Sequence, residues 1–220
     1  MLQASTLLFL KNLAANNNKT WFDANRKIYE NAKADYLNFV ANVLIELKKI
    51  DTSLELLEPK QCVFRINRDV RFSKNKDPYK NNMGAHFTMG GKKQPSAGYY
   101  FHCQPNESFI GGGIWMPMAD ELKRIRQEID YNCAEFNGIV STTKFKKIYG
   151  GLDASAKLSR PPKGYEENNE AIEFLKLKSF TAIAPITNED LTSKGLIKKV
   201  TTHFEALMPL IHFLNRAVVA

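Results

Sequence analysis

The chain has 220 residues, of which 44% are hydrophobic and 25% are charged. This length suits one large domain or two small ones, and the composition is typical of a globular protein rather than a disordered chain. The formal net charge of +8 at pH 7 fits an anionic ligand or partner, although a charge of this size also serves solubility alone.

Three widely spaced cysteines, Cys62, Cys103 and Cys133, include no CxxC pair. They indicate neither a disulfide framework nor a cysteine-rich metal site, so a reducing compartment is expected. The apolar N-terminal run has no basic segment before it and is interrupted by Lys11, which is not typical of a signal peptide. No apolar run approaches the roughly 18 residues of a membrane span. The sequence therefore predicts a cytoplasmic protein without a membrane partner.

Two helices are predicted at the start of the chain. The first covers residues 5–16 and ends in a run of three asparagines. From about residue 20 to residue 50, apolar side chains recur every three or four positions, beginning at Trp21 and ending at Ile50. This spacing predicts one long amphipathic helix.

Alternation of apolar and polar side chains predicts β-strands in the middle of the chain and one more near its end. The middle strands follow one another without intervening helices, as in an antiparallel meander. The predicted strands are 62–67, 84–89, 97–103, 107–115 and 179–186.

Helices are predicted after the meander, beginning at Pro117, which suits the first position of a helix. The last helix covers about residues 194–218, and Pro209 is expected to bend or break it. Residues 150–168 are expected to be a long irregular loop. The predicted fold class is α+β, with a mostly antiparallel sheet of about five strands packed on one side by long N- and C-terminal helices. A single domain spanning residues 1–220 is expected.

The chain contains none of the common catalytic or phosphate-loop motifs, so it leaves the question of enzyme activity open and predicts no cofactor. The run Gly111-Gly112-Gly113 lies within a predicted strand. It indicates either a bulge or a close approach by another backbone or a ligand. His86 and His102, with Glu107 near, fall short of a ligand set, and no metal site is predicted.

The most distinctive segment is residues 65–80, where six basic side chains face only two acidic ones. If the strands pair as predicted, alternate side chains of this segment share a sheet face with His86, Tyr100 and His102. Such a wall of Arg, His, Tyr and Asn is suited to bind phosphate or carboxylate. The candidate ligand-binding residues are Arg65, Asn67, Arg68, Asp69, Arg71, Lys74, Tyr79, Lys80, His86, Tyr100 and His102.

Two other interpretations use the same segment. In the first, it belongs to a nucleic-acid-binding surface that also includes Lys92, Lys93, Lys144, Lys146 and Lys147. In the second, it is an internal salt-bridge network of a structural or interaction protein, in which Asp69 fixes one arginine. Tyr79 has two interpretations as well, because it either stacks on a ligand ring or packs in the core. A phosphate-bearing small molecule and a nucleic acid thus both remain possible partners, and the oligomeric state is not indicated.

The sequence also resembles a known family. The resembling segments are FLKNLAANNNKTWFDANRKIYE (9–30), FRINRDVRFSKNKDPYKNNMGAHF (64–87), GGGIWMP (111–117), LSRPPKGY (158–165), LKLKSF (175–180) and PLIHFLN (209–215). Together they resemble the domain of unknown function 2461, an uncharacterised bacterial and fungal family, over nearly the whole chain. This resemblance implies a single α+β domain with no assigned reaction, cofactor or partner.

Overall fold

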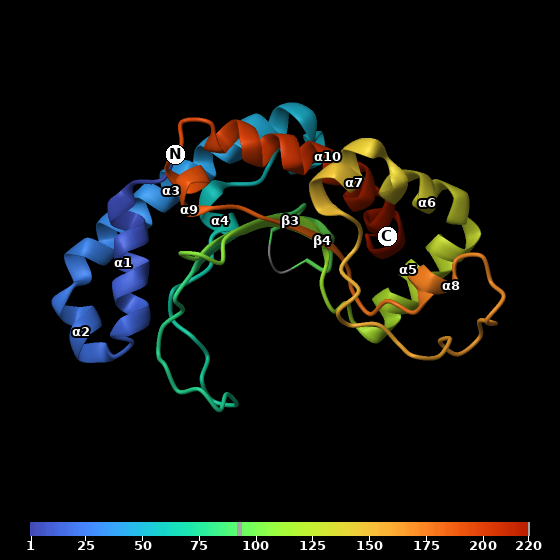
Figure 1. Ribbon diagram of the computed structural model, residues 1–220, viewed down its shortest axis with the longest axis horizontal. Helices are drawn as coiled ribbons and strands as arrows, with labels where there is room; N and C mark the ends of the chain where they lie inside the picture. Colours follow the sequence, from blue (N-terminus) through green and yellow to red (C-terminus); the bar gives the residue numbers. More distant parts are fainter. Residues whose placement is uncertain (92–93, 220) are drawn as a thin grey trace.

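The computed structural model describes residues 1–91 and 94–219, so the predicted surface residues Lys92 and Lys93 lie outside the described residues. The chain forms an arch of helices around a small sheet (Figure 1). The helices are α1 (Ala4–Ala15), α2 (Lys19–Ala24), α3 (Arg26–Ile50), the short 3-10 helix η1 (Thr52–Leu54), α4 (Pro59–Cys62), α5 (Ala119–Tyr131), α6 (Cys133–Ser141), α7 (Thr143–Tyr149), α8 (Ile172–Leu175), α9 (Asn188–Thr192) and α10 (Leu196–Val218). The strands are β1 (Met83–Phe87), β2 (Gly98–Cys103), β3 (Phe109–Ile114) and β4 (Phe180–Pro185).

The sheet has the order β1-β2-β3-β4, and every neighbouring pair is antiparallel. The predicted α+β class and the meander are confirmed. Within the described residues the sheet has four strands rather than about five, because residues 62–67 do not form a strand.

The reason lies in the start of α4. Pro59 begins this helix, and the side chains and backbones of Glu58 and Gln61 form a capping box there, which favours a helical turn over an extended chain. After Cys62 the chain runs along the edge of β1 and makes only isolated bridges, such as Val63 to Ala85.

The long helix predicted for residues 20–50 is interrupted at Asn25. Its side chain donates a hydrogen bond to the carbonyl of Trp21 at 2.8 Å, and its ψ of 17° leaves the helical range. An asparagine side chain that bonds to the local backbone competes with helix propagation. The segment is therefore divided into α2 and α3.

One face of the sheet is covered by α3 and α10 (Figure 1). Phe101 of β2 packs against Phe39 of α3 with ring centroids 4.8 Å apart, and Tyr99 packs against Phe204 of α10 at 5.1 Å. The long helices thus cover one side of the sheet, as predicted. Of the two outcomes expected at Pro209, a bend or a break, the break does not occur, because α10 continues through this residue.

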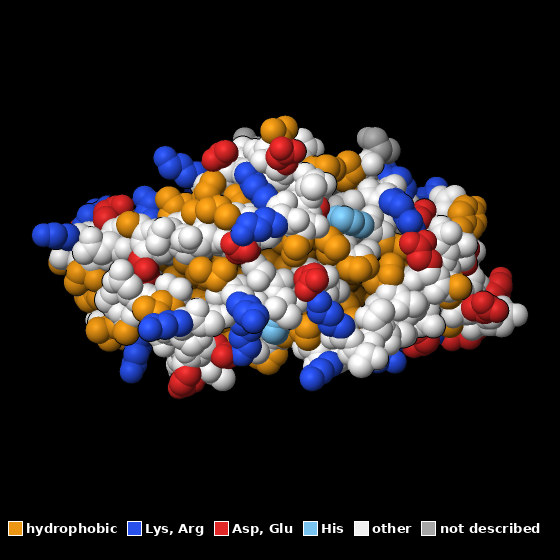
Figure 2. Space-filling view, turned by 90° about the horizontal axis from the view of Figure 1, so that it is seen from above, with side chains coloured by type: hydrophobic (Ala, Val, Ile, Leu, Met, Phe, Trp, Pro, Cys, Tyr) orange, Lys and Arg blue, Asp and Glu red, His pale blue; other side chains and the backbone are white. Residues whose placement is uncertain are grey.

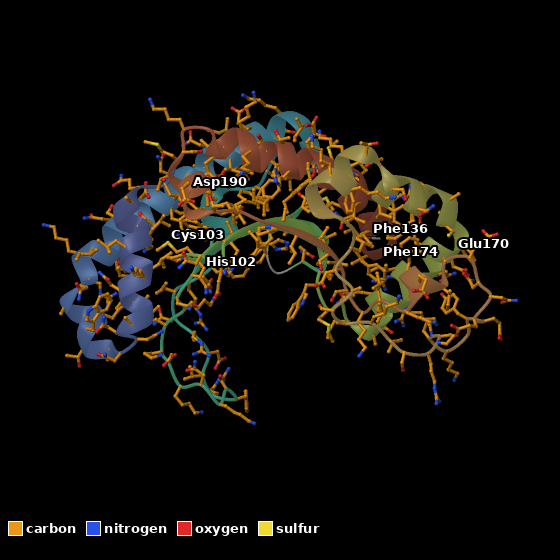
Figure 3. The ribbon with its side chains drawn as sticks, in the orientation of Figure 1. His102, Cys103, Phe136, Glu170, Phe174 and Asp190 are labelled. Atoms are coloured by element: carbon orange, nitrogen blue, oxygen red, sulfur yellow. The ribbon has the colours of Figure 1, made fainter. Side chains whose placement is uncertain are left out.

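Helices α5, α6 and α8 and the end of α10 form one end of the arch (Figure 1). Phe136 and Phe174 point toward each other there (Figure 3), with ring centroids 5.0 Å apart. At the other end, the loop that precedes β1 projects below the sheet (Figure 1). Among the described residues, no helix combines the length and apolarity needed to cross a bilayer.

Candidate functional site: a cleft on the open face of the sheet

The sheet face opposite α3 and α10 presents three side chains that the sequence places together. In the register, His86 pairs with Tyr100, and Tyr100 and His102 are two residues apart on β2. They therefore lie on one face, as predicted. Figure 3 labels His102 beside Cys103, whose side chain is fully buried on the helical side.

The middle of this face is a floor of glycines. Gly111 and Gly113 pair with Tyr100 and Gly98 on one side and with β4 on the other, so the pairing is regular and the bulge interpretation is wrong. Gly112 faces α10, and a Cβ atom there would lie 3.0 Å from Leu207. The glycine run thus permits a close approach of α10 on one face, and on the other face the side chain of Ile183 lies 2.8 Å from the position of a Cβ atom on Gly111.

A cleft of about 730 Å³ lies over this floor, within the range of about 300–1,000 Å³ that small-molecule sites occupy. Most of its lining is apolar or aromatic, with polar side chains between. The lining includes Phe64, His86, Tyr100, Phe109, Trp115, Met116, Met118, Glu121, Asp153, Thr181 and Ile183.

The segment that follows β3 forms an exposed apolar rim. Trp115 is 76% exposed and Met118 is 72% exposed. Met116 between them has a φ of 45°, a conformation that is uncommon outside glycine. The hydroxyl oxygen of Ser179 accepts a hydrogen bond from the Met116 backbone at 2.9 Å and holds this turn. Strained backbone of this kind is enriched at ligand sites.

A second hollow of about 430 Å³ adjoins the first, since Phe64 and Tyr100 line both. It is lined by two cations, Arg68 and Lys80, and by Asp69. The ammonium of Lys80 lies over the Phe64 ring, 5.2 Å from its centroid. The open face therefore joins a mostly apolar cleft to a hollow lined by two cations and one carboxylate.

The loop that bears these cations is held by its own hydrogen bonds. Arg68 donates to the Asp77 carbonyl at 3.0 Å and to the Ser73 hydroxyl at 3.2 Å. Arg71 makes a two-pronged contact with Asp69, at 2.9 and 2.7 Å, on the exposed surface. This contact holds the pKa of Asp69 below its ordinary value, and Arg65 adds a smaller effect. The loop contains ion pairing as the second interpretation expected, but the pair is exposed.

Several candidate residues lie outside the two hollows. Arg65, Asn67, Arg71 and Lys74 are exposed and line neither of them. Tyr79 is buried and its ring stacks on Phe22 at 4.0 Å. Its backbone exchanges two hydrogen bonds with the Asn17 side chain. Tyr79 thus anchors the loop to α2 from the core side.

A chain of hydrogen bonds begins at the Tyr100 hydroxyl. This group lies 3.2 Å from Nδ1 of His102, whose Nε2 lies 3.1 Å from the Gln104 side-chain oxygen. The Gln104 amide nitrogen then donates to Glu107. The His102 ring stacks on Phe109 at 4.7 Å. Burial lowers the pKa of His102 from its ordinary value and raises the pKa of Tyr100, so both groups are kept neutral near pH 7.

Residues 5–213 match the family described as Conserved hypothetical protein (DUF2461). The chain belongs to this family. The resemblance seen in the sequence motifs is therefore confirmed. No curated protein and no solved structure matches the chain. Because the family description assigns no activity, the function of this DUF2461 protein has to be argued from the chemistry of the site.

Sequence reasoning missed several cleft residues of this DUF2461 member. The run Trp115-Met116-Pro117-Met118 after the glycines was an available signal, because large apolar side chains beside a turn often mark a binding rim. No local sequence pattern marks Glu121 or Asp153 as cleft residues. Each lies outside the strands, and only the tertiary structure brings it to the cleft. Within residues 1–91 and 94–219, no group of three His, Cys, Asp or Glu side chains is placed to hold a metal ion.

Proposed function

We propose that this DUF2461 protein binds a phosphate-bearing small molecule with a flat ring, such as a mononucleotide, on the open face of the sheet. The proposal rests on the two hollows that meet at Phe64 and Tyr100. One offers an apolar and aromatic surface for a ring, and the other offers cations for an anion. A reaction is not part of the proposal.

The larger cleft is suited to bind the ring of such a ligand. A glycine floor lets a planar group approach the backbone closely. The aromatic side chains beside it form a cluster, in which Tyr100 lies 6.3 Å from Phe64 and 5.7 Å from Phe109 between ring centroids. Stacking on such a surface is worth about 1–3 kcal/mol per base in nucleic-acid complexes.

The smaller hollow is suited to bind the phosphate of such a ligand. Two of the five N–H donors of Arg68 are used to hold the loop, which fixes the guanidinium in place. A fixed guanidinium beside a lysine is a preorganised partner for an anion. Because Asp69 is paired with Arg71, its charge opposes the anion less than that of an unpaired carboxylate.

Isothermal titration calorimetry with mononucleotides, sugar phosphates and inorganic phosphate tests this proposal. Lys80→Ala removes one cation of the hollow and is expected to weaken binding about tenfold, because a hydrogen bond to a charged group is worth about 1.5–3 kcal/mol. Lys74→Ala is the matched control, since Lys74 is an exposed lysine of the same loop that lines neither hollow. It is expected to change affinity less than twofold.

Two results would contradict the proposal. In one, no member of the panel binds to the wild-type protein. In the other, Lys80→Ala binds as tightly as the wild type. A strong preference for oligonucleotides whose affinity falls steeply with salt would instead support nucleic-acid binding. Lys144 of that surface is paired with Glu205 at 2.6 Å, and α7, which carries it, lies on the helical side of the sheet (Figure 1). This arrangement favours the small molecule.

A further inference from the structure

The two hollows of the open face differ in the sign of their charged side chains. Arg68 and Lys80 line the smaller hollow together with Asp69. Among the described residues that line the larger cleft, the charged side chains are two carboxylates, Glu121 and Asp153. The chain as a whole has a formal net charge of +8. The larger cleft is therefore a locally negative part of a basic protein.

Asp153 lies at the end of the sheet away from the smaller hollow. Its backbone N–H donates to the Thr181 carbonyl at 2.7 Å, and Thr181 pairs with Gly113. Gly113 in turn pairs with Gly98 of β2, whereas the smaller hollow is lined by His102, four positions further along the same strand. Four positions span about 13 Å, since a strand rises about 3.3 Å per residue. A ligand that reaches both hollows therefore has its two ends beside charges of opposite sign.

Each of the two carboxylates is held in place by a backbone N–H group. Glu121, in the first turn of α5, accepts from Met118 at 2.7 Å, and Asp153 accepts from Ser155 at 2.9 Å. Within residues 1–91 and 94–219, neither carboxylate forms a salt bridge. Their negative charge in the cleft is thus not offset by a paired lysine or arginine among these residues.

The aromatic wall of the cleft adds to this attraction for positive charge. Tyr100, Phe109 and Trp115 all line it. The face of an aromatic ring is negative, and tryptophan attracts a cation more strongly than the other rings. Carboxylates act on the same cation through Coulomb attraction over several ångströms, so they need not share a hydrogen bond with it. The larger cleft therefore attracts a flat cation both through its aromatic rings and through its carboxylates.

We infer that the ring bound in the larger cleft carries a fixed positive charge, as a pyridinium or thiazolium ring does. The ligand class is a phosphorylated compound with such a ring, whose phosphate lies beside Arg68 and Lys80 in the smaller hollow. This inference rests on the proposed function and narrows it. It needs no N–H donor on the ring, because the discrimination is between a charged ring and a neutral ring of the same shape.

Calorimetry with nicotinamide mononucleotide and its reduced form tests the inference. The two compounds have the same phosphate, ribose and carboxamide, but only the oxidised ring is positive. The wild-type protein is expected to bind the oxidised form at least fivefold more tightly. The net charge of +8 would by itself favour the reduced form, which is the more negative of the two. A preference for the oxidised form therefore has to arise in the cleft.

Glu121→Gln and Asp153→Asn each remove one charge and keep a side-chain oxygen for the backbone hydrogen bond. Each is expected to lower the ratio of oxidised to reduced affinity at least twofold, and the double variant should bind the two forms within twofold of each other. Asp120→Asn is the matched control, because Asp120 is an exposed carboxyl of the same helical turn that lines neither hollow. It should leave the ratio unchanged.

The outcomes separate the two proposals. If neither form binds, and no other mononucleotide, sugar phosphate or inorganic phosphate binds, both are overturned. If the two forms bind equally, or the reduced form binds more tightly, the inference is wrong while the proposed function stands. The same holds if other members of the panel bind and the oxidised form does not. If the double variant retains the preference with a wild-type circular dichroism spectrum, the carboxylates are not its source and the inference is overturned.

Discussion

Asp51 is 2% exposed. Its carboxylate contacts side chains of η1, β2 and α10. One oxygen accepts from the Ser53 hydroxyl at 2.6 Å, and the other accepts from the Tyr99 hydroxyl of β2 at 2.6 Å. His212 of α10 lies 3.2 Å away. Burial opposes the charged form, but these hydrogen bonds and His212 outweigh it, so the pKa of Asp51 lies below its ordinary value.

Asp51→Asn is expected to lower the free energy of unfolding by about 1–3 kcal/mol at pH 7, because it weakens hydrogen bonds to a buried charged acceptor. Urea denaturation measures the change. Asp77→Asn, an exposed carboxyl of the loop, is the control and should change stability by less than about 0.5 kcal/mol.

The effect of Asp51 should depend on pH in one direction. Because its folded pKa is lowered, its charge stabilises the protein above the unfolded value of about 3.9. This contribution is lost as the pH falls through the lower folded pKa. The difference in unfolding free energy between wild type and Asp51→Asn should therefore shrink when denaturation is repeated near pH 3. A difference that grows toward acid would contradict the assignment.

At the residue scale, the sequence predicts side-chain direction where strands are regular and fails where the chain folds back on itself. His86, Tyr100 and His102 share a face because alternation in a strand is geometric. Tyr79 follows a loop whose closure depends on Asn17, 62 residues earlier. No local pattern encodes that distant contact, so both interpretations of Tyr79 were open from sequence alone.

At the scale of elements, the packing of β3 requires glycines, because there is no room for a Cβ atom at some of its positions. Gly113 has a φ of 113°, and a Cβ atom there would lie 2.0 Å from the Phe180 carbonyl oxygen of β4. Gly138 of α6 has no atom within 4 Å of the corresponding position. The two glycines therefore provide a matched comparison of the same substitution.

Gly113→Ala is expected to destabilise the protein by about 2 kcal/mol or more, because alanine meets both an unfavourable φ and a clash with β4. Gly138→Ala is expected to stabilise it by about 0.5–1 kcal/mol, since alanine is the better helix former. Thermal unfolding followed by circular dichroism measures both changes. Equal effects of the two substitutions would show that β3 tolerates a side chain at position 113.

Element types could be predicted better than element ends. The stripe from Trp21 to Ile50 fits a single helix, and only the local hydrogen bond of Asn25 divides it. The alternation in residues 62–67 fits a strand, but the capped turn at Pro59 precedes it. The cleft itself combines β3, β4, α5 and the loop at Asp153. Its existence depends on tertiary placement, which periodicity does not contain.

Across the whole molecule, the positive charge is not gathered on the helical side. Figure 2 shows Lys and Arg side chains interspersed with Asp and Glu over that face. Ion pairs such as Lys199 to Asp190 and Arg216 to Glu135 account for part of this mixture. This face of mixed sign therefore offers little attraction to a long polyanion.

Helix α10 links the two ends of the arch. It contacts α3 and α9 as well as α5 and α6. Near its end, Arg124 of α5 donates to the Ala217 carbonyl at 2.9 Å, and Arg216 contacts both Glu128 and Glu135. The buried side chains of both ends belong to one hydrophobic cluster. A helix that contributes to every part of one core should couple their unfolding.

We therefore expect residues 1–220 to unfold as a single domain. Native-state hydrogen exchange in increasing urea measures this, because amides in a cooperative unit share one opening free energy. The most protected amides of α3, at one end, and of α5, at the other, should lose protection at the same urea concentration. If α5 and α6 lost protection well before α3, the arch would contain two domains, with α10 as a linker between separate cores rather than the centre of one.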